Sequence, residues 1–344
     1  MRALTRIAAF ALAAAAGGAP AATLDPRLPA YEPLPAAVPA GARYASADGT
    51  VHIVLGNRGI GATIEGFNAL FARTHPGTRF ATEYNKEGNT LNIAALMHGV
   101  TLLCPLARDI NAAEKRAYAD WVGAEPFVVN IAHGTLTSVR MTAGLAVYVN
   151  KANPIHELTL DQLARIFTSG APGGDLTYWG QLGATGEWAS RPIHTYGTPE
   201  YSGYGYFMVK SKWGDRALAP GYEAFELAAQ IVKRVGEDSH GIGFAGQGFL
   251  TRQTRLVALS ENPSGPFMEG TEEEVASGRY PLDRYVGVAI RRAPGEPLDA
   301  FVKEYLRLVL SREGQAIVAA EADGYVPLNA EQVAAERAKL GITR

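Results

Sequence analysis

The stretch YGTPEYSGYGYF (residues 196–207) follows the strand-like run RPIHT (residues 191–195) and leads from a Gly-Thr-Pro turn to a Ser-Gly pair and an aromatic segment. This order predicts a strand, a turn and the first turn of a helix. The first amides of a helix lack partners within the helix and carry partial positive charge, so such a junction suits an anion or a polar ligand. An ordinary strand-to-helix loop shows the same pattern, and the stretch alone leaves both interpretations open.

The succession of strand, glycine-rich turn and helix also occurs at residues 51–71. VHIVL (residues 51–55) predicts a buried strand and GNRGIG (residues 56–61) a turn, after which apolar residues follow at helical spacing. Further strands and helices alternate through residue 131, which predicts an α/β fold with a mostly parallel sheet and a ligand site at the carboxyl ends of its strands. The glycines do not have the G-x-G-x-x-G spacing of a dinucleotide site, so no cofactor is expected.

A second strand end lies at PLARDIN (residues 105–111), where Arg108 is a candidate contact for an anion. A surface ion pair between Arg108 and the adjacent Asp109 is an equally good interpretation of this loop.

The N-terminus has the features of a secretory signal peptide. Arg2 and Arg6 precede a short apolar run (residues 7–16), and Ala19-Pro20-Ala21 offers small residues for cleavage. We therefore expect residues 1–21 to be removed and the mature chain to be exported to the periplasm. Residues 22–50 are rich in Pro and Ala, which predicts an extended leader.

Composition excludes several classes of protein. The formal net charge is −2 and no basic stripe interleaved with aromatic residues occurs, so nucleic acid is not an expected partner. The single cysteine, Cys104, can form no internal disulfide and does not lie beside the cleavage site as a lipid acceptor would.

Enzyme motifs are also missing from the sequence. The seven histidines show neither H-E-x-x-H nor paired metal spacing, and G-x-S-x-G does not occur. His240 is expected in a turn rather than as a base. We therefore expect no catalytic residues and no metal site.

Several later segments resemble the phosphate-binding proteins of ABC importers, in the family's order between residues 51 and 328. They are VYVNKANP (147–154), LTLDQLARIF (158–167), WGQLG (179–183), LSREGQAIV (310–318) and GYVPL (324–328). The resemblance implies an α/β, two-lobed periplasmic-binding-protein fold of type II, with two crossing strands, near residues 144–150 and 285–290, as a hinge. It implies one lobe of residues 51–146 plus 286–344 and a second lobe of residues 147–285.

The resemblance further implies a small anionic ligand, phosphate or a related oxyanion, held between the lobes of a monomer that serves ABC-importer membrane subunits. The family's ligand loop reads R-x-x-x-S-G-T; here Ser202 and Gly203 match and Thr198 falls at the arginine, while Tyr204 either replaces the threonine or follows its deletion. The residues expected at the ligand are Arg58, Gly59, Ile60, Gly61, Ala107, Arg108, Thr198, Ser202, Gly203 and Tyr204.

The family's other two loops usually offer Ser, Thr or Asp, where this chain has GIGA (59–62) and LAR (106–108). Loss of the arginine and of two hydroxyl contacts could weaken phosphate binding by several powers of ten, because hydrogen bonds to charged groups contribute roughly 1.5–3 kcal/mol each. Arg58 and Arg108 could restore the charge from the first lobe. Tyr201, Tyr204 and Tyr206 could instead stack on a larger ligand or simply pack in the core. The alternative function is a divergent binding-fold protein with a signalling, scaffold or other-ligand role that no longer binds phosphate tightly.

Overall fold

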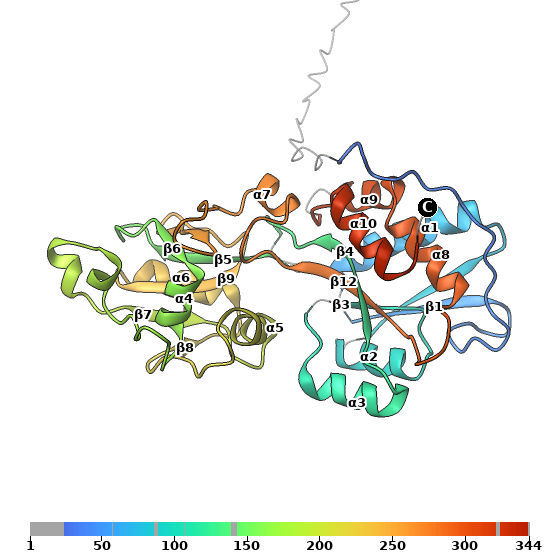
Figure 1. Cartoon of the computed structure of the whole chain (residues 1–344), viewed down its shortest axis with the longest axis horizontal. Helices are drawn as coiled ribbons and strands as arrows, with labels where there is room; N and C mark the ends of the chain where they lie inside the picture. The colour runs from blue at the N-terminus through green and yellow to red at the C-terminus, as the bar shows by residue number, and fades with distance from the viewer. Residues whose placement is uncertain are drawn as a thin grey trace, which may run out of the picture.

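The computed structural model describes residues 24–56, 58–85, 89–106, 108–138, 143–320 and 324–342. The chain forms two α/β lobes that lie side by side and are joined by neighbouring chain segments (Figure 1). The first lobe holds both the N-terminal and the C-terminal parts of the chain, and the second holds the middle. The two-lobed fold expected from the sequence is confirmed.

The first lobe contains a parallel strand pair and a three-stranded antiparallel sheet. Strand β1 (Thr50–Leu55) pairs with β2 (Arg79–Tyr84), and β12 (Tyr285–Ile290) lies between β3 (Cys104–Leu106) and β4 (Phe127–His133). Its helical elements are η1 (Arg58–Ile60), α1 (Gly61–Thr74), α2 (Asn89–Met97), α3 (Ala112–Val122), α8 (Ala300–Val309), α9 (Arg312–Ala319) and α10 (Ala330–Lys339).

The second lobe is built on a five-stranded sheet of order β10-β5-β9-β7-β8. These strands are β5 (Leu145–Asn150), β7 (His194–Gly197), β8 (Glu223–Ala224), β9 (Gly241–Gly246) and β10 (Thr254–Leu256), and a separate pair joins β6 (Glu157–Thr159) to β11 (Ala258–Ser260). The helical elements are α4 (Leu160–Phe167), η2 (Trp179–Leu182), η3 (Gly186–Ser190), α5 (Gly203–Phe207), the π-helical η4 (Met208–Lys212), α6 (Ala228–Glu237) and α7 (Glu272–Ala276).

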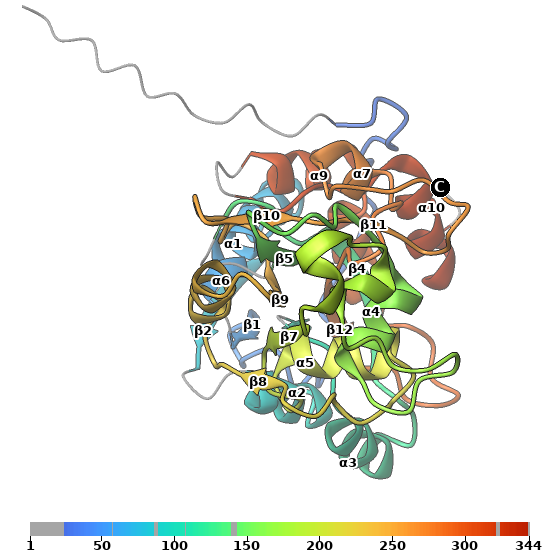
Figure 2. The same ribbon diagram turned by 90° about the vertical axis from the view of Figure 1, so that its left-hand side faces the viewer.

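Two layers of helices cover the second lobe's sheet, as Figure 2 shows for α4 and α6 on either side of β5, β9 and β7. Leu145, Val147 and Val149 of β5 belong to the apolar core that includes α4, whereas Ala146 and Tyr148 belong to the core that includes α6. Alternate side chains of a strand point to opposite faces, so a continuous apolar run such as LAVYV is required where both faces are covered.

The expectation of a mostly parallel sheet is wrong. Strand β5 runs antiparallel to both β10 and β9, and β12 runs antiparallel to both β3 and β4, while β7 is parallel to β8 and β9. Both β5 and β12 adjoin the crossing between the lobes. A strand that enters its sheet from the other lobe is not preceded by a local βαβ crossover, so the rule for parallel neighbours does not apply to it.

The lobes are connected where residues 133–134 and 143–145 lie beside residues 282–285. The Gly134 amide donates to the Arg284 carbonyl (2.7 Å), and the Leu145 amide donates to the Leu282 carbonyl (3.1 Å). At the same place the buried His133 ring bonds the Asp283 carboxylate through Nδ1 (2.6 Å). The lobe boundaries at residues 146 and 286 stay a prediction.

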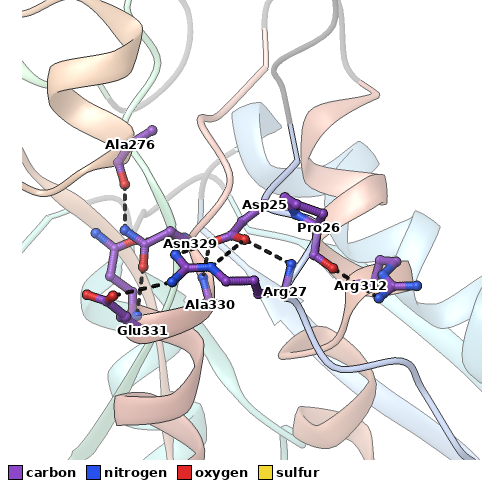
Figure 3. A network of polar contacts seen from close by, with 9 residues as sticks. Asp25, Pro26, Arg27, Ala276, Arg312, Asn329, Ala330 and Glu331 are labelled. Atoms are coloured by element: carbon purple, nitrogen blue, oxygen red, sulfur yellow. Dashed lines mark hydrogen bonds and ion pairs between the residues drawn. The ribbon is translucent and has the colours of Figure 1, made fainter.

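The leader packs along the first lobe without helix or strand through residue 44. Figure 3 shows Asp25 accepting hydrogen bonds from Arg27 and from the Ala330 amide, and Arg312 donating to the Pro26 carbonyl. Leu28 is fully buried in the first lobe's core. Residues 1–21, the predicted signal peptide, lie outside the described residues. Among the described helices, none is long and apolar enough to cross a membrane.

Candidate functional site

The cleft between the lobes is bordered by the start of α5 on one side and by the loop after β3 on the other. A Cβ placed on Gly203 would lie 2.7 Å from the Cβ of Arg108. This distance is too short for two real Cβ atoms, so only glycine allows the first turn of α5 to approach the other lobe this closely. The structure thus brings the predicted residues Arg108 and Gly203 together.

The hydroxyls of the ligand loop are used differently from the way the family pattern implies. The Ser202 Oγ accepts a hydrogen bond from the Gly205 amide (3.0 Å), so Ser202 is the N-cap of α5. Thr198 is 4% exposed, and its Oγ1 has no hydrogen-bond partner among the described residues. Its carbonyl accepts a hydrogen bond from the Tyr222 hydroxyl (2.7 Å), which fixes the turn after β7.

Arg108 is held within its own lobe by a bidentate ion pair. Its Nη1 and Nη2 lie 2.8 and 2.6 Å from the two carboxylate oxygens of Glu114, and it also donates to Thr90 and to the carbonyl of Asp109. The ion-pair partner of Arg108 is therefore Glu114 at the start of α3 and not the Asp109 carboxylate, while contact of Arg108 with an anion stays a prediction. Glu114 also belongs to the capping box of α3. In this box the Asn111 side chain accepts a hydrogen bond from the Glu114 amide, and the Glu114 carboxylate accepts one from the Asn111 amide.

The ion pair shifts the pKa of both partners. Burial of the Glu114 carboxyl acts to raise its pKa, but hydrogen bonds from Arg108 and from the Asn111 amide outweigh burial, and the net pKa lies below the usual value of 4.5. The Glu114 carboxylate in turn raises the pKa of Arg108. A guanidinium whose two terminal nitrogens, Nη1 and Nη2, are both bound in this way has little capacity left for a ligand.

The Tyr84 side chain packs against the backbone at the start of α1. A Cβ on Gly61 would lie 2.0 Å from the Tyr84 hydroxyl oxygen, and Ile60 is buried in the core at 3% exposure. Gly59 lies in the short turn η1. The Arg58 side chain and Ala107 lie outside the described part of the structure, so their predicted roles stay predictions.

A different arginine, which the sequence interpretation passed over, occupies the cleft. The side chain of Arg284 is 3% exposed and lines a cavity of about 180 Å³ between the lobes. Its Nη1 has no hydrogen-bond partner among the described residues, and its Nη2 lies 4.0 Å from an Asp109 carboxylate oxygen. Its guanidinium carbon lies 5.0 Å from the ring centre of Tyr204 and 5.2 Å from that of Phe207. The Tyr204 ring therefore lies against a cation, and its hydroxyl accepts a hydrogen bond from the Ala143 amide (3.3 Å).

An unpaired acceptor lines the same cavity. The Oδ2 of Asp283 bonds His133, whereas its Oδ1 is buried without a hydrogen-bond partner among the described residues. Leu106, Asn130 and Tyr285, from β3, β4 and β12, also line this cavity. The cavity thus presents one buried donor and one buried acceptor that a small ligand could satisfy together.

A sequence signal for Arg284 did exist. The pair Asp283-Arg284 directly precedes the apolar run YVGVAI (residues 285–290), which resembles the second crossing strand of the family. Asp283 and Arg284 both line the cavity between the lobes.

Residues 47–313 match the model of the PBP superfamily domain, and the chain belongs to this superfamily. Within it the chain belongs to the family of the phosphate-binding protein PstS. It is 31% identical to the Pseudomonas aeruginosa protein of that name over 347 residues, which cover 99% of this chain and 98% of the relative. The protein SphX of Synechococcus elongatus is 32% identical over 54% of each chain.

Solved structures agree with the fold. An ABC-type phosphate transport receptor from Vibrio cholerae covers 80% of this chain with 98% of its own, at 20% identity and a TM-score of 0.53. PstS from Borrelia burgdorferi covers 81% of this chain with 99% of its own, at 16% identity and a TM-score of 0.54. Membership in this family places the chain among solute-binding proteins rather than enzymes.

Proposed function

We propose that the chain is the solute-binding component of a phosphate ABC importer and captures phosphate or a related oxyanion between its two lobes. The proposal rests on Arg284, a buried guanidinium in the cavity between the lobes whose Nη1 is bound by none of the residues that the structure describes. A buried charge without full compensation is costly, and an anionic ligand supplies the missing partner.

Arg284 compensates for the arginine that Thr198 replaces in the ligand loop. Charge-assisted hydrogen bonds contribute roughly 1.5–3 kcal/mol each, so two bonds from one guanidinium restore much of the affinity that the substituted loop loses. The positive charge comes from the hinge segment instead of from the loop before α5. The rings of Tyr204 and Phe207 hold the guanidinium in place for this role.

The presence of both Arg284 and Asp283 in one cavity favours an oxyanion that carries a proton. Hydrogen phosphate offers acceptor oxygens to Arg284 and a hydroxyl donor to the free Oδ1 of Asp283. Sulfate at neutral pH has no hydrogen to donate, so its oxygen would face a carboxylate, with a penalty from two unpaired negative groups.

Calorimetry on the untagged chain tests the proposal. We expect phosphate to bind at least about a hundredfold more tightly than sulfate, and Asp283→Asn to narrow this ratio, because an amide can donate to either anion. Equal affinities for the two anions, or no binding of either at millimolar concentration, would overturn it.

The export and transport roles complete the proposal. Residues 1–21 direct the chain to the periplasm, where mass spectrometry should find a mature N-terminus near Ala22.

The lobes of residues 51–146 plus 286–344 and of residues 147–285 close on the ligand as a monomer and deliver it to the membrane subunits. Small-angle scattering should show compaction when phosphate is added. The signalling or scaffold alternative is not favoured, because the relative that matches the whole chain is named as a phosphate-binding protein.

A further inference from the structure

A cluster of metal-ligating side chains lies at the end of the second lobe's sheet that is opposite the cleft. His194 is the first residue of β7, and Asp238 and His240 lie in the turn between α6 and β9. The cleft residues follow the other end of β7. Each of the three side chains offers one ligand atom within 4.8 Å of those of the other two.

The backbone that carries these residues is fixed by the sheet. Strands β7 and β9 are parallel, with His194 opposite Gly241 in the register. The His194 amide donates to the His240 carbonyl (3.3 Å), and the His240 amide donates to the Oδ1 of Asp238 (2.9 Å). The two imidazole ring centres are 5.4 Å apart. The donor set is therefore preorganised and not assembled from mobile loops.

The Asp238 carboxylate is oriented by a buried tyrosine. Its Oδ2 accepts a hydrogen bond from the Tyr196 hydroxyl (2.7 Å) and lies 2.7 Å from the Nδ1 of His194. Hydrogen bonds to ligating carboxylates are a regular feature of metal sites, because they fix the direction of the lone pairs. The nearby Arg234 stacks on the Tyr196 ring and lies 3.7 Å from the Glu223 carboxylate, which offsets its charge.

We propose that His194, Asp238 and His240 form a binding site for a divalent transition-metal ion of the Zn²⁺ type, separate from the anion cleft. Two imidazoles and one carboxylate are a donor set that zinc accepts with a fourth position left to water. Zinc requires ligand distances of about 2.0–2.2 Å, so the cluster must contract by rotation of its side chains. His194 can supply this movement because its side chain is 46% exposed.

The sequence alone could not show this site. His194 lies far from Asp238 and His240 in the chain, and no local metal spacing links them; His240 is indeed in a turn, as expected, but parallel strands bring that turn beside His194. The metal would join the start of β7 to the end of α6 and thereby brace the second lobe far from the ligand.

The test is calorimetry with Zn²⁺ on the untagged, chelator-treated full chain, with circular dichroism to confirm folding of each variant. We expect one ion per chain, a loss of affinity of at least about a hundredfold for His194→Ala and for His240→Ala, and a loss of about tenfold for Tyr196→Phe, which leaves all three ligands in place. The matched control is His52→Ala, which removes a histidine that faces a single carboxylate, Glu83 (3.0 Å), and should leave affinity unchanged.

A spectroscopic readout locates the ion independently. The Trp188 ring centre lies 6.4 Å from that of His240, and the Trp179 Nε1 donates to the His240 carbonyl (3.1 Å). Cu²⁺ bound at the site should therefore quench tryptophan fluorescence, and the quenching should fall strongly in His240→Ala. Phosphate affinity should be the same with and without zinc, which separates this site from the cleft. Zinc binding that survives the double variant His194→Ala/His240→Ala, or no binding at 100 µM zinc, would overturn the proposal.

Discussion

Two arginines border the cleft, and their surroundings differ in one decisive respect. Arg108, in the loop after β3, is held by both oxygens of Glu114. Within the described part of the chain, the Nη1 of Arg284 in the hinge has no hydrogen-bond partner, and its Nη2 lies 4.0 Å from Asp109. Arg108 stands where a strand-end ligand residue is expected, yet its charge is already neutralised. The partner of a charged side chain, and not its position in a loop, therefore decides whether the side chain is available to bind a ligand or instead stabilises the fold.

The largest expected effect is on anion affinity, measured by calorimetry with phosphate. Arg284→Met should weaken binding by at least about a hundredfold, because it removes the charge and both charge-assisted donors from the cavity. Arg108→Met should weaken it by less than about threefold, since that guanidinium is already bound at both nitrogens. Arg284→Lys retains the charge without the planar donor pair, so its affinity for phosphate should lie between those of the wild type and Arg284→Met. If Arg108→Met were the more damaging substitution, the assignment of roles would be reversed.

The free energy of unfolding should respond in the opposite order to these two substitutions. Arg108→Met should lower the free energy of unfolding by about 2 kcal/mol, because it leaves the carboxylate of Glu114, whose side chain is only 9% exposed, without its cation. Arg284→Met should change it by less than about 0.5 kcal/mol, because the residue it leaves behind, Asp109, is half exposed and loses only a distant partner. Urea denaturation of the three proteins without ligand measures both values. Equal destabilisation by the two substitutions would contradict the contrast.

The stability contribution of the Arg108–Glu114 pair should also depend on pH. Because the pKa of Glu114 is lower in the folded chain than the usual value of 4.5, the contribution is fully present above that value and is lost as the pH falls through the lower, folded pKa. The difference in melting temperature between wild type and Arg108→Met should therefore be constant near neutrality and shrink below about pH 4.5. Other carboxylates titrate in both proteins and cancel in the difference. A gap that stayed constant down to pH 2 would show that the lost stability has another origin.

Much of the fold could be predicted from the sequence, and the site could not, for physical reasons that individual residues show. The apolar runs of β1 and β5 and the cap residue Thr159 of α4 determine local structure within a few residues of themselves, so a local pattern suffices to find them. The state of Arg108 depends on Glu114 across a turn, and that of Arg284 depends on the rings of Tyr204 and Phe207, which are distant in the sequence. Contacts of this kind leave no periodic trace in the chain.

Thr198 offers the smallest effect and the finest test of the same comparison, because it stands at the family's arginine position but is itself nearly buried. Its Oγ1 lacks a partner among the described residues, so Thr198→Val removes an unsatisfied buried hydroxyl while keeping the branched shape, and should raise the free energy of unfolding by up to about 1 kcal/mol. If the hydroxyl contacts the anion in the closed cleft, the same substitution should weaken phosphate binding by about tenfold, the worth of one neutral hydrogen bond. The neighbouring control is Tyr222→Phe, which removes the hydrogen bond to the Thr198 carbonyl. It should lower the free energy of unfolding and should not strengthen phosphate binding. A Thr198→Val chain that is more stable and binds phosphate unchanged would show that the charge at Arg284 has replaced not only the lost arginine but the whole contribution of this loop position.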